Sequence, residues 1–150
     1  MTSSTTSTRR EGRIPPHSWT VVKIIVLDTD VASRLQRGTV PLDHLSALRT
    51  GTPAITFVTV AEMFKGAFKA AWGQAASGSS NRGWQAGPVL PYDVTVARVW
   101  GRLVADCEAV GIPVAANDAW IAACCIAAGV PLMTLNRKHF EVIPGLTLLP

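Results

Sequence analysis

The 150-residue sequence has no long hydrophobic run, few charged residues and few cysteines. Its longest apolar run, residues 119–130, is too short to span a bilayer and is followed at once by Pro131, which excludes a membrane-spanning segment there. Only 16% of the residues are charged and 48% are apolar, a balance typical of a globular and rather hydrophobic protein. No internal repeat or second domain is visible, and a chain of this length fits one domain with its own core.

The three cysteines, Cys107, Cys124 and Cys125, lie inside apolar runs and are odd in number. Two of them are adjacent, and neighbours in a chain rarely form a disulfide. We expect all three to be reduced core residues of a cytoplasmic protein. No group of cysteines and histidines has the spacing of a zinc site, which excludes the common structural zinc motifs.

The first 20 residues are rich in serine and threonine, contain three arginines and lack the apolar core of a signal peptide. We expect residues 1–20 to form a disordered leader before a single domain of residues 21–150. The net charge of +4 permits binding to a polyanion without requiring it.

From residue 21 onward, short apolar runs alternate with helical patterns. Continuous runs rich in β-branched residues favour strands that are buried on both faces. The predicted strands are residues 21–27, 54–58, 131–135 and 146–149, with a short extended piece at 88–92; the predicted helices are 31–37, 41–48, 59 to about 72–76, 94–110 and 119–128. This alternation predicts an α/β fold, a three-layer α/β/α sandwich with a mainly parallel central sheet.

Three carboxylates fall at the boundaries of these elements. Asp28 follows the first strand, Glu62 lies in the first turn of the helix that begins at Thr59, and Asp118 stands at the start of another helix. Because a parallel sheet gathers strand ends and helix starts at one edge, these acids can converge there, and Asn136 ends a further element at the same edge. Clustered carboxylates repel one another, and Mg²⁺ or Mn²⁺ relieves that repulsion. Such an ion can activate water for attack on a phosphate.

Each acid also has a purely structural explanation. Asp28 or Asp30 could cap the helix that follows, as could Thr29. Thr59 and Glu62 have the spacing of a capping box, in which each side chain bonds the other's backbone. Asp118 could be a first-turn acid favoured by the helix dipole.

Four short motifs resemble those of PIN-domain ribonucleases, and most of all the VapC toxins of bacterial toxin–antitoxin pairs. They are Leu27-Asp28-Thr29-Asp30, Thr59-Val60-Ala61-Glu62, Asn117-Asp118-Ala119-Trp120-Ile121-Ala122-Ala123 and Met133-Thr134-Leu135-Asn136-Arg137-Lys138-His139-Phe140. The resemblance covers roughly residues 22–149, with the motifs in family order and spacing. It implies a Mg²⁺- or Mn²⁺-dependent endoribonuclease that forms a homodimer, cuts structured RNA (transfer or ribosomal) and is silenced by a cognate antitoxin.

Carried over position by position, Asp28, Glu62 and Asp118 match the family's acidic residues. Asn136 matches a position that is often a fourth acid, and its amide can coordinate or orient without adding charge. We expect Asp28 and Asp118 to hold the metal, and Glu62 to position or deprotonate the attacking water or to join the metal shell. Asn136 and Asp30 are expected to support the site, and hydrolysis is expected to leave a 3′-hydroxyl and a 5′-phosphate.

Two alternatives remain open. Asp28-Thr29-Asp30 after an apolar strand also resembles the nucleophile motif of haloacid-dehalogenase-type phosphatases, in which Asp28 would attack phosphorus and Asp30 would be the acid. That family needs a later acidic pair, which is missing from the strand that ends in Asn136. The other alternative is a catalytically dead domain that binds RNA or a protein partner. Trp84 is the best candidate for stacking on a base, and His139 is expected at the surface.

Overall fold

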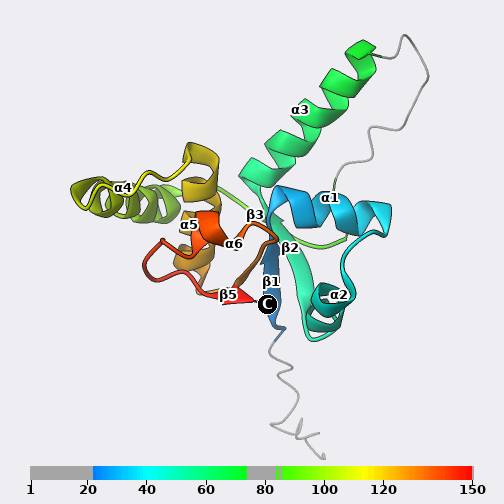
Figure 1. Ribbon diagram of the computed structural model, residues 1–150, viewed down its shortest axis with the longest axis horizontal. Helices are drawn as coiled ribbons and strands as arrows, with labels where there is room; N and C mark the ends of the chain where they lie inside the picture. The colour runs from blue at the N-terminus through cyan, green and yellow to red at the C-terminus, as the bar shows by residue number, and fades with distance from the viewer. Residues whose placement is uncertain (1–21, 74–83, 85, 150) are drawn as a thin grey trace, which may run out of the picture.

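A five-stranded parallel sheet forms the centre of the molecule, in the strand order β3-β2-β1-β4-β5 (Figure 1). The computed structural model describes residues 22–73, 84 and 86–149. Its strands are β1 (Ile24–Leu27), β2 (Thr52–Thr56), β3 (Val89–Leu90), β4 (Leu132–Met133) and β5 (Leu148–Leu149). All four strand pairings are parallel, as predicted, and the last strand lies at an edge.

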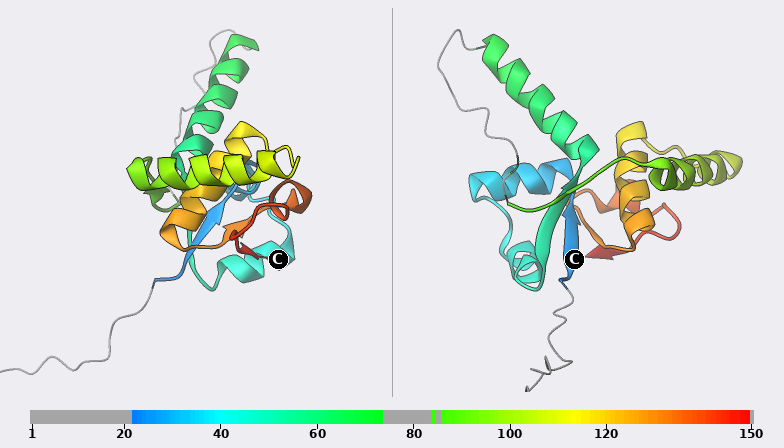
Figure 2. Two further views of the ribbon diagram at one scale, coloured as in Figure 1. Left: turned by 90° about the vertical axis from the view of Figure 1, so that its left-hand side faces the viewer. Right: turned by 180° about the vertical axis from the view of Figure 1, so that it is seen from behind.

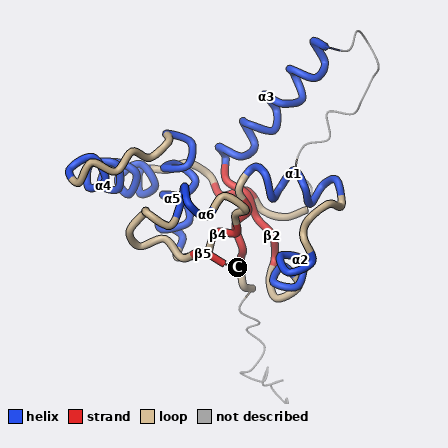
Figure 3. The backbone as a smooth tube through the Cα atoms, viewed as in Figure 1, coloured by secondary structure: helices blue, strands red, loops and turns tan. Residues whose placement is uncertain are grey.

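Helices cover both faces of this sheet, so the predicted three-layer sandwich is confirmed (Figures 2 and 3). The helices are α1 (Thr29–Arg37), α2 (Leu42–Leu48), α3 (Phe57–Gly73), α4 (Val94–Ala109), α5 (Ala116–Ala128) and α6 (Arg137–Phe140). In Figure 1, α1 and α2 lie on one side of the strands and α4, α5 and α6 on the other. The far end of α3 projects beyond the sheet, away from the other helices.

The side chains of β1 alternate between two hydrophobic clusters. Ile25 and Leu27 are fully buried in the cluster that includes Val31 of α1. Val26 is fully buried in the opposite cluster, with Ala122 of α5. A strand turns successive side chains to opposite faces, so an unbroken apolar run is what a doubly covered strand requires. The first strand therefore carries the core on both its faces up to Asp28.

The second strand and the following helix begin earlier than the sequence pattern predicts. The β-branched and aromatic pair Phe57-Val58 favours a strand, yet it opens α3. Thr56 provides the reason, because its Oγ1 accepts the backbone N–H of Thr59 at 3.3 Å and so caps the first turn. The predicted start at Thr59 and its capping box are therefore wrong, and Glu62 lies in the second turn.

Most helix ends follow the predicted residues. Gly38 and Gly129 close α1 and α5 with positive φ angles of 67° and 65°, a conformation that glycine adopts without strain. Asp93 caps α4 by accepting the backbone N–H of Val96 at 2.8 Å. Of the three candidate caps for α1, Asp28 is the one that caps the helix, and Thr29 and Asp30 lie inside its first turn.

The serine- and glycine-rich composition of residues 77–83 predicts a flexible connector. This segment falls outside the described residues, as does the disordered leader predicted at residues 1–20. Within the described part of the chain, no helix is long and apolar enough to cross a membrane.

Candidate active site

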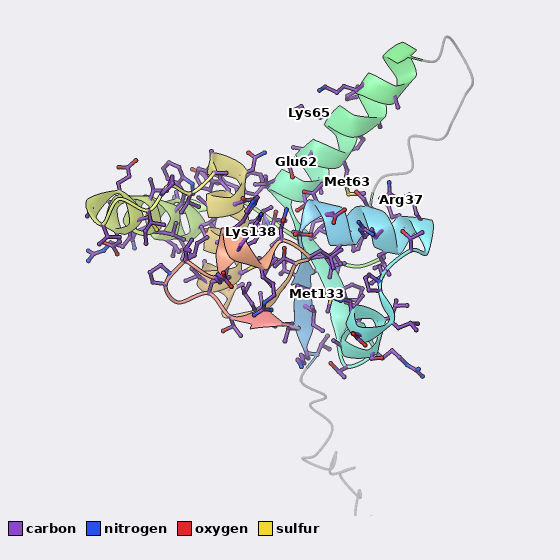
Figure 4. All side chains as sticks on the ribbon, viewed as in Figure 1. Arg37, Glu62, Met63, Lys65, Met133 and Lys138 are labelled. Carbon is purple, nitrogen blue, oxygen red and sulfur yellow. The ribbon has the colours of Figure 1, made fainter. Side chains whose placement is uncertain are left out.

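The three predicted acids lie at the carboxyl edge of the sheet, on three different elements. Asp28 follows β1, Glu62 is in the second turn of α3, and Asp118 is in the first turn of α5. Helix α5 begins at Ala116 rather than at the predicted Ala119. The charge of Asp118 acts on Asp28, and that of Glu62 acts on Asp118. Figure 4 shows Glu62 at the foot of α3, above the end of the sheet. The structure therefore places the three acids on elements that meet at one edge of the sheet.

Asp28 is a buried carboxylate, 6% exposed, held by hydrogen bonds on both oxygens. Oδ1 accepts the backbone N–H of Val31 at 2.9 Å, and Oδ2 accepts the hydroxyl of Thr134 at 2.5 Å. Burial raises the pKa of Asp28, the two hydrogen bonds lower it, and the charges of Asp30 and Asp118 raise it again, with a net increase. Asp28 is thus both a helix cap and a carboxylate whose charge lacks full compensation.

Glu62 is held by donors from two other helices. The Thr29 hydroxyl of α1 donates to Oε2, and the Asn117 amide of α5 donates to Oε1 at 2.7 Å. Both donors are uncharged, so they fix the carboxylate in place while leaving its charge unbalanced. This pair of bonds joins α1, α3 and α5 at the acidic edge.

Asp118 is half-buried and pairs with His139, which belongs to α6. The Nδ1 of His139 lies 3.4 Å from Oδ2 of Asp118. Burial raises the pKa of Asp118, the contact with His139 lowers it, and the charge of Glu62 raises it, with a net increase. His139 is exposed as expected, but it contacts the acidic site.

The two expected supporting residues lie further out. Asn136 is exposed just after β4, and its backbone N–H donates to Thr134 Oγ1 at 2.9 Å. Asp30 is exposed on α1, where it forms an i,i+4 ion pair with Arg34 at 3.2 Å. Its charge nevertheless raises the pKa of Asp28.

The donor set suits a hard divalent cation. Mg²⁺ is usually bound by one or two carboxylates and keeps several waters. Asp28 and Asp118 provide two carboxylates whose charges repel, and a bound cation would offset both that repulsion and the burial that chiefly raises the pKa of Asp28. Within the described ranges, no three His, Cys, Asp or Glu side chains are grouped closely enough to hold one ion together. The residues therefore fit a metal site in which two carboxylates bind the ion and water or substrate completes its coordination.

Sequence reasoning missed the residues that hold the acids. Thr134 was noted only as part of a motif, although it is fully buried and bonds Asp28 across 106 positions of the chain. Asn117 belongs to one of the four motifs, and Thr29 is a candidate cap as well as a motif residue, but nothing in the sequence pattern pairs either of them with Glu62. The sequence does contain a signal for these residues, because each motif that carries an acid also contains a residue with a hydroxyl or amide side chain.

The chain has an α/β sandwich fold with an acidic site at the carboxyl edge, and the comparisons identify its family. The model of the PIN domain matches residues 25–146, so the chain belongs to the PIN-domain family. The plasmid stability protein StbB of Pseudomonas syringae pv. tomato is 30% identical over 127 residues, which cover 79% of this chain and 91% of that protein. The resemblance to PIN domains that the four motifs predict is confirmed.

Solved structures with the same fold come from VapBC toxin–antitoxin systems. VapBC2 from Rickettsia felis, solved with a promoter DNA fragment, has a TM-score of 0.66 at 24% identity, covering 84% of this chain and 97% of that one. VapBC-1 from nontypeable Haemophilus influenzae has a TM-score of 0.66 at 22% identity, covering 84% and 96%. VapBC-5 from Mycobacterium tuberculosis has a TM-score of 0.56 at 24% identity, covering 84% and 97%.

Proposed function

We propose that this protein is the endoribonuclease toxin of a toxin–antitoxin pair, cutting structured RNA such as transfer or ribosomal RNA with the help of Mg²⁺ or Mn²⁺. One observation carries the proposal: the buried Asp28 carboxylate lies within electrostatic range of a second carboxylate, Asp118, at the ligand-binding edge of a PIN-domain sheet. Residues 21–150 would form the nuclease domain. The family match and the resemblance to VapBC structures support the toxin assignment.

Asp28 and Asp118 would hold the divalent ion, directly or through water. When bound, the ion would lower the pKa of a water and stabilise the negative charge that develops on the phosphate. The hydrogen bonds of Asp28 to Thr134 and Val31 aim its two oxygens before any ligand arrives. Asn136, with its exposed amide, and Asp30, through its charge, would support this site from outside.

Glu62 would position the attacking water and accept its proton. Because Thr29 and Asn117 hold its two oxygens, the carboxylate has one fixed orientation and can still accept a proton on a remaining lone pair. The water oxygen bonds to phosphorus while the bond to the 3′-oxygen breaks, and solvent protonates the released 3′-oxygen. The products are a 3′-hydroxyl and a 5′-phosphate.

The phosphatase alternative is less well supported. It requires Asp30 to act as the acid next to Asp28, whereas Asp30 lies exposed on α1 and pairs with Arg34. Membership of the PIN-domain family also favours nuclease chemistry. A phosphoenzyme trapped on Asp28 would restore this alternative.

An antitoxin and a second copy of the chain are the proposed protein partners. The projecting helix α3 carries Phe64 and Phe68, which stack on each other at 6.2 Å and are 38% and 52% exposed. An exposed aromatic pair of this kind suits a protein interface. Co-expression with the product of an adjacent small gene should inhibit cleavage and give a stable complex, and light scattering of the free protein should give the mass of a dimer.

Cleavage of a panel of transfer and ribosomal RNAs with Mg²⁺, Mn²⁺ or EDTA tests the catalytic proposal. We expect cleavage with either ion, none with EDTA, and none for Asp28→Asn or Asp118→Asn at any ion concentration. The matched control is Asp43→Asn, which removes an exposed carboxylate from α2, at the other end of the sheet in Figure 1. Full activity of Asp28→Asn, or equal cleavage in EDTA, would refute the assignment.

A further inference from the structure

Four aromatic side chains form a cluster near the carboxyl edge of the sheet. Tyr92, just after β3, meets Phe57 of α3 edge-to-face at 5.8 Å and Trp120 of α5 at 5.7 Å. Phe57 and Trp120 also meet edge-to-face, at 6.1 Å, and Trp100 of α4 stacks on Trp120 at 4.6 Å. Edge-to-face contacts on two sides hold the Tyr92 ring in one orientation.

Tyr92 is the member of this cluster that solvent reaches. It is 55% exposed, whereas Phe57, Trp100 and Trp120 are half-buried. A large exposed aromatic ring on a rigid base has an available π-face, and ordering it for a ligand costs little further entropy.

The cluster lies at the same edge of the sheet as the acids. β3 ends at Leu90, so Tyr92 lies beyond its carboxyl end, as Asp28 lies beyond that of β1. Phe57 opens the helix that carries Glu62, and Trp120 follows Asp118 by two residues in α5. Seen from behind in Figure 2, the segment that precedes α4 crosses the foot of α3 on its way to that helix. The Tyr92 ring therefore lies near the N-terminal ends of α3 and α5, the helices that carry Glu62 and Asp118.

Trp84, which the sequence suggested for base stacking, is already engaged. Its indole N–H donates to the carbonyl oxygen of Gly87 at 2.8 Å, and its ring packs against the cluster around Ile25 and Leu27. The opposite flank of the site is basic, because Arg137, Lys138 and His139 are exposed on α6. Figure 4 shows Lys138 on the side of α6. A polyanion lying across the acids would thus meet cations at one side and an aromatic ring at the other.

We propose that Tyr92 is a stacking platform for an unpaired nucleobase of the RNA, close to the scissile phosphate. This inference rests on the proposed nuclease function and adds a substrate feature to it: the RNA must present an unstacked base beside the cleaved bond. Every base has a π-face, so the platform contributes affinity and selects single-stranded or looped regions rather than a particular sequence. Tyr92 binds substrate and takes no part in proton transfer.

The test compares Tyr92→Phe, Tyr92→Leu and Tyr92→Ala in two assays. The first measures kcat and KM on an RNA that the wild-type protein cleaves. The second measures binding of a single-stranded RNA of mixed sequence, labelled with 2-aminopurine at one position, to the same variants in an Asp28→Asn background. Leu42→Ala is the matched control, since it removes an exposed apolar side chain from α2, away from the acidic edge.

We expect Tyr92→Ala and Tyr92→Leu to weaken binding and raise KM roughly tenfold, with a smaller change in kcat. When the labelled base stacks on Tyr92, the fluorescence of 2-aminopurine should be quenched, and both variants should abolish this quenching. Tyr92→Phe and Leu42→Ala should behave as wild type. Tyr92→Leu retains the apolar contacts with Phe57 and Trp120, so its failure separates stacking from packing. Unchanged RNA affinity in both truncated variants refutes the platform, and a changed mass in light scattering then identifies a protein interface instead. If the wild-type protein cleaves and binds no RNA, the proposed function itself fails.

Discussion

Replacing Thr134 with valine should destabilise the protein in a way that depends on pH. Thr134 is fully buried, donates to Asp28 Oδ2 at 2.5 Å and accepts the backbone N–H of Asn136 at 2.9 Å. Valine has the same shape, so no cavity forms, but both hydrogen bonds are lost. A bond to a charged group contributes about 1.5–3 kcal/mol and a neutral one about 0.5–1.5 kcal/mol, which gives a loss of roughly 3 kcal/mol near neutral pH.

The pH dependence follows from the ionisation of Asp28. The Thr134 hydroxyl lowers the pKa of Asp28, so Asp28 has a higher pKa in Thr134→Val than in the wild type. The stability difference between wild type and Thr134→Val should therefore be largest above both folded-state pKa values and should shrink as the pH falls through them. Below both values Asp28 is protonated in either protein, and only the loss of the other interactions remains.

Urea unfolding of the metal-free protein, followed by tryptophan fluorescence at neutral and acidic pH, measures both effects. A loss of this size corresponds to a fall in Tm of roughly 6–12 °C for a chain of this size. Thr134→Ser is the control, because it keeps the hydroxyl and loses one methyl group, at a cost of about 1 kcal/mol. If serine destabilises as much as valine, or if the valine effect is the same at both pH values, packing rather than the hydrogen bond explains the role of Thr134.

Three further predictions concern single side chains. Because burial raises the pKa of Asp28, its ionisation removes stability as the pH rises through the folded-state pKa; metal-free Asp28→Asn should therefore gain stability relative to wild type near neutral pH, and urea titrations should show the gain shrinking in acid. Because His139 lowers the pKa of Asp118, the acid limb of the pH–rate profile of His139→Ala should move to higher pH, and an unmoved limb would show that the contact has no influence. Burial raises the pKa of Cys124 to about 11 and that of Cys125 further, so both thiols should resist a thiol-specific reagent until urea unfolds the protein.

The fold could be predicted from the sequence because its signals are local. Continuous apolar runs marked β1 and β4, and Gly38 and Gly129 end their helices as expected. Several elements begin two or three residues earlier than the pattern predicts, and the start of α3 is displaced because local preferences conflict there. Phe57 and Val58 favour a strand by shape, and the cap formed by Thr56 outweighs that preference.

The acids could be located from the sequence, but the interactions that hold them could not. Asp28, Glu62 and Asp118 follow from the rule that parallel strands end at one edge. The bond between Asp28 and Thr134 spans 106 positions, and that between Glu62 and Asn117 spans 55. Such pairs depend on the register of strands and the rotation of helices, which the hydrophobic pattern determines only to within about a residue.

The chemistry of these partners explains how the site can be rigid and still bind a cation. A hydroxyl and an amide hold Glu62, and a hydroxyl and a backbone amide hold Asp28, so neither carboxylate is neutralised by its support. Within the described residues, the carboxylates paired with arginine are Asp30 and Asp106, both on exposed helix faces. A cationic partner beside Asp28 would neutralise the carboxylate and compete with the ion. Neutral donors leave both carboxylates charged, so the burial of Asp28, and to a smaller extent the repulsion from Asp118, lower the stability of the metal-free protein and favour binding of a divalent cation.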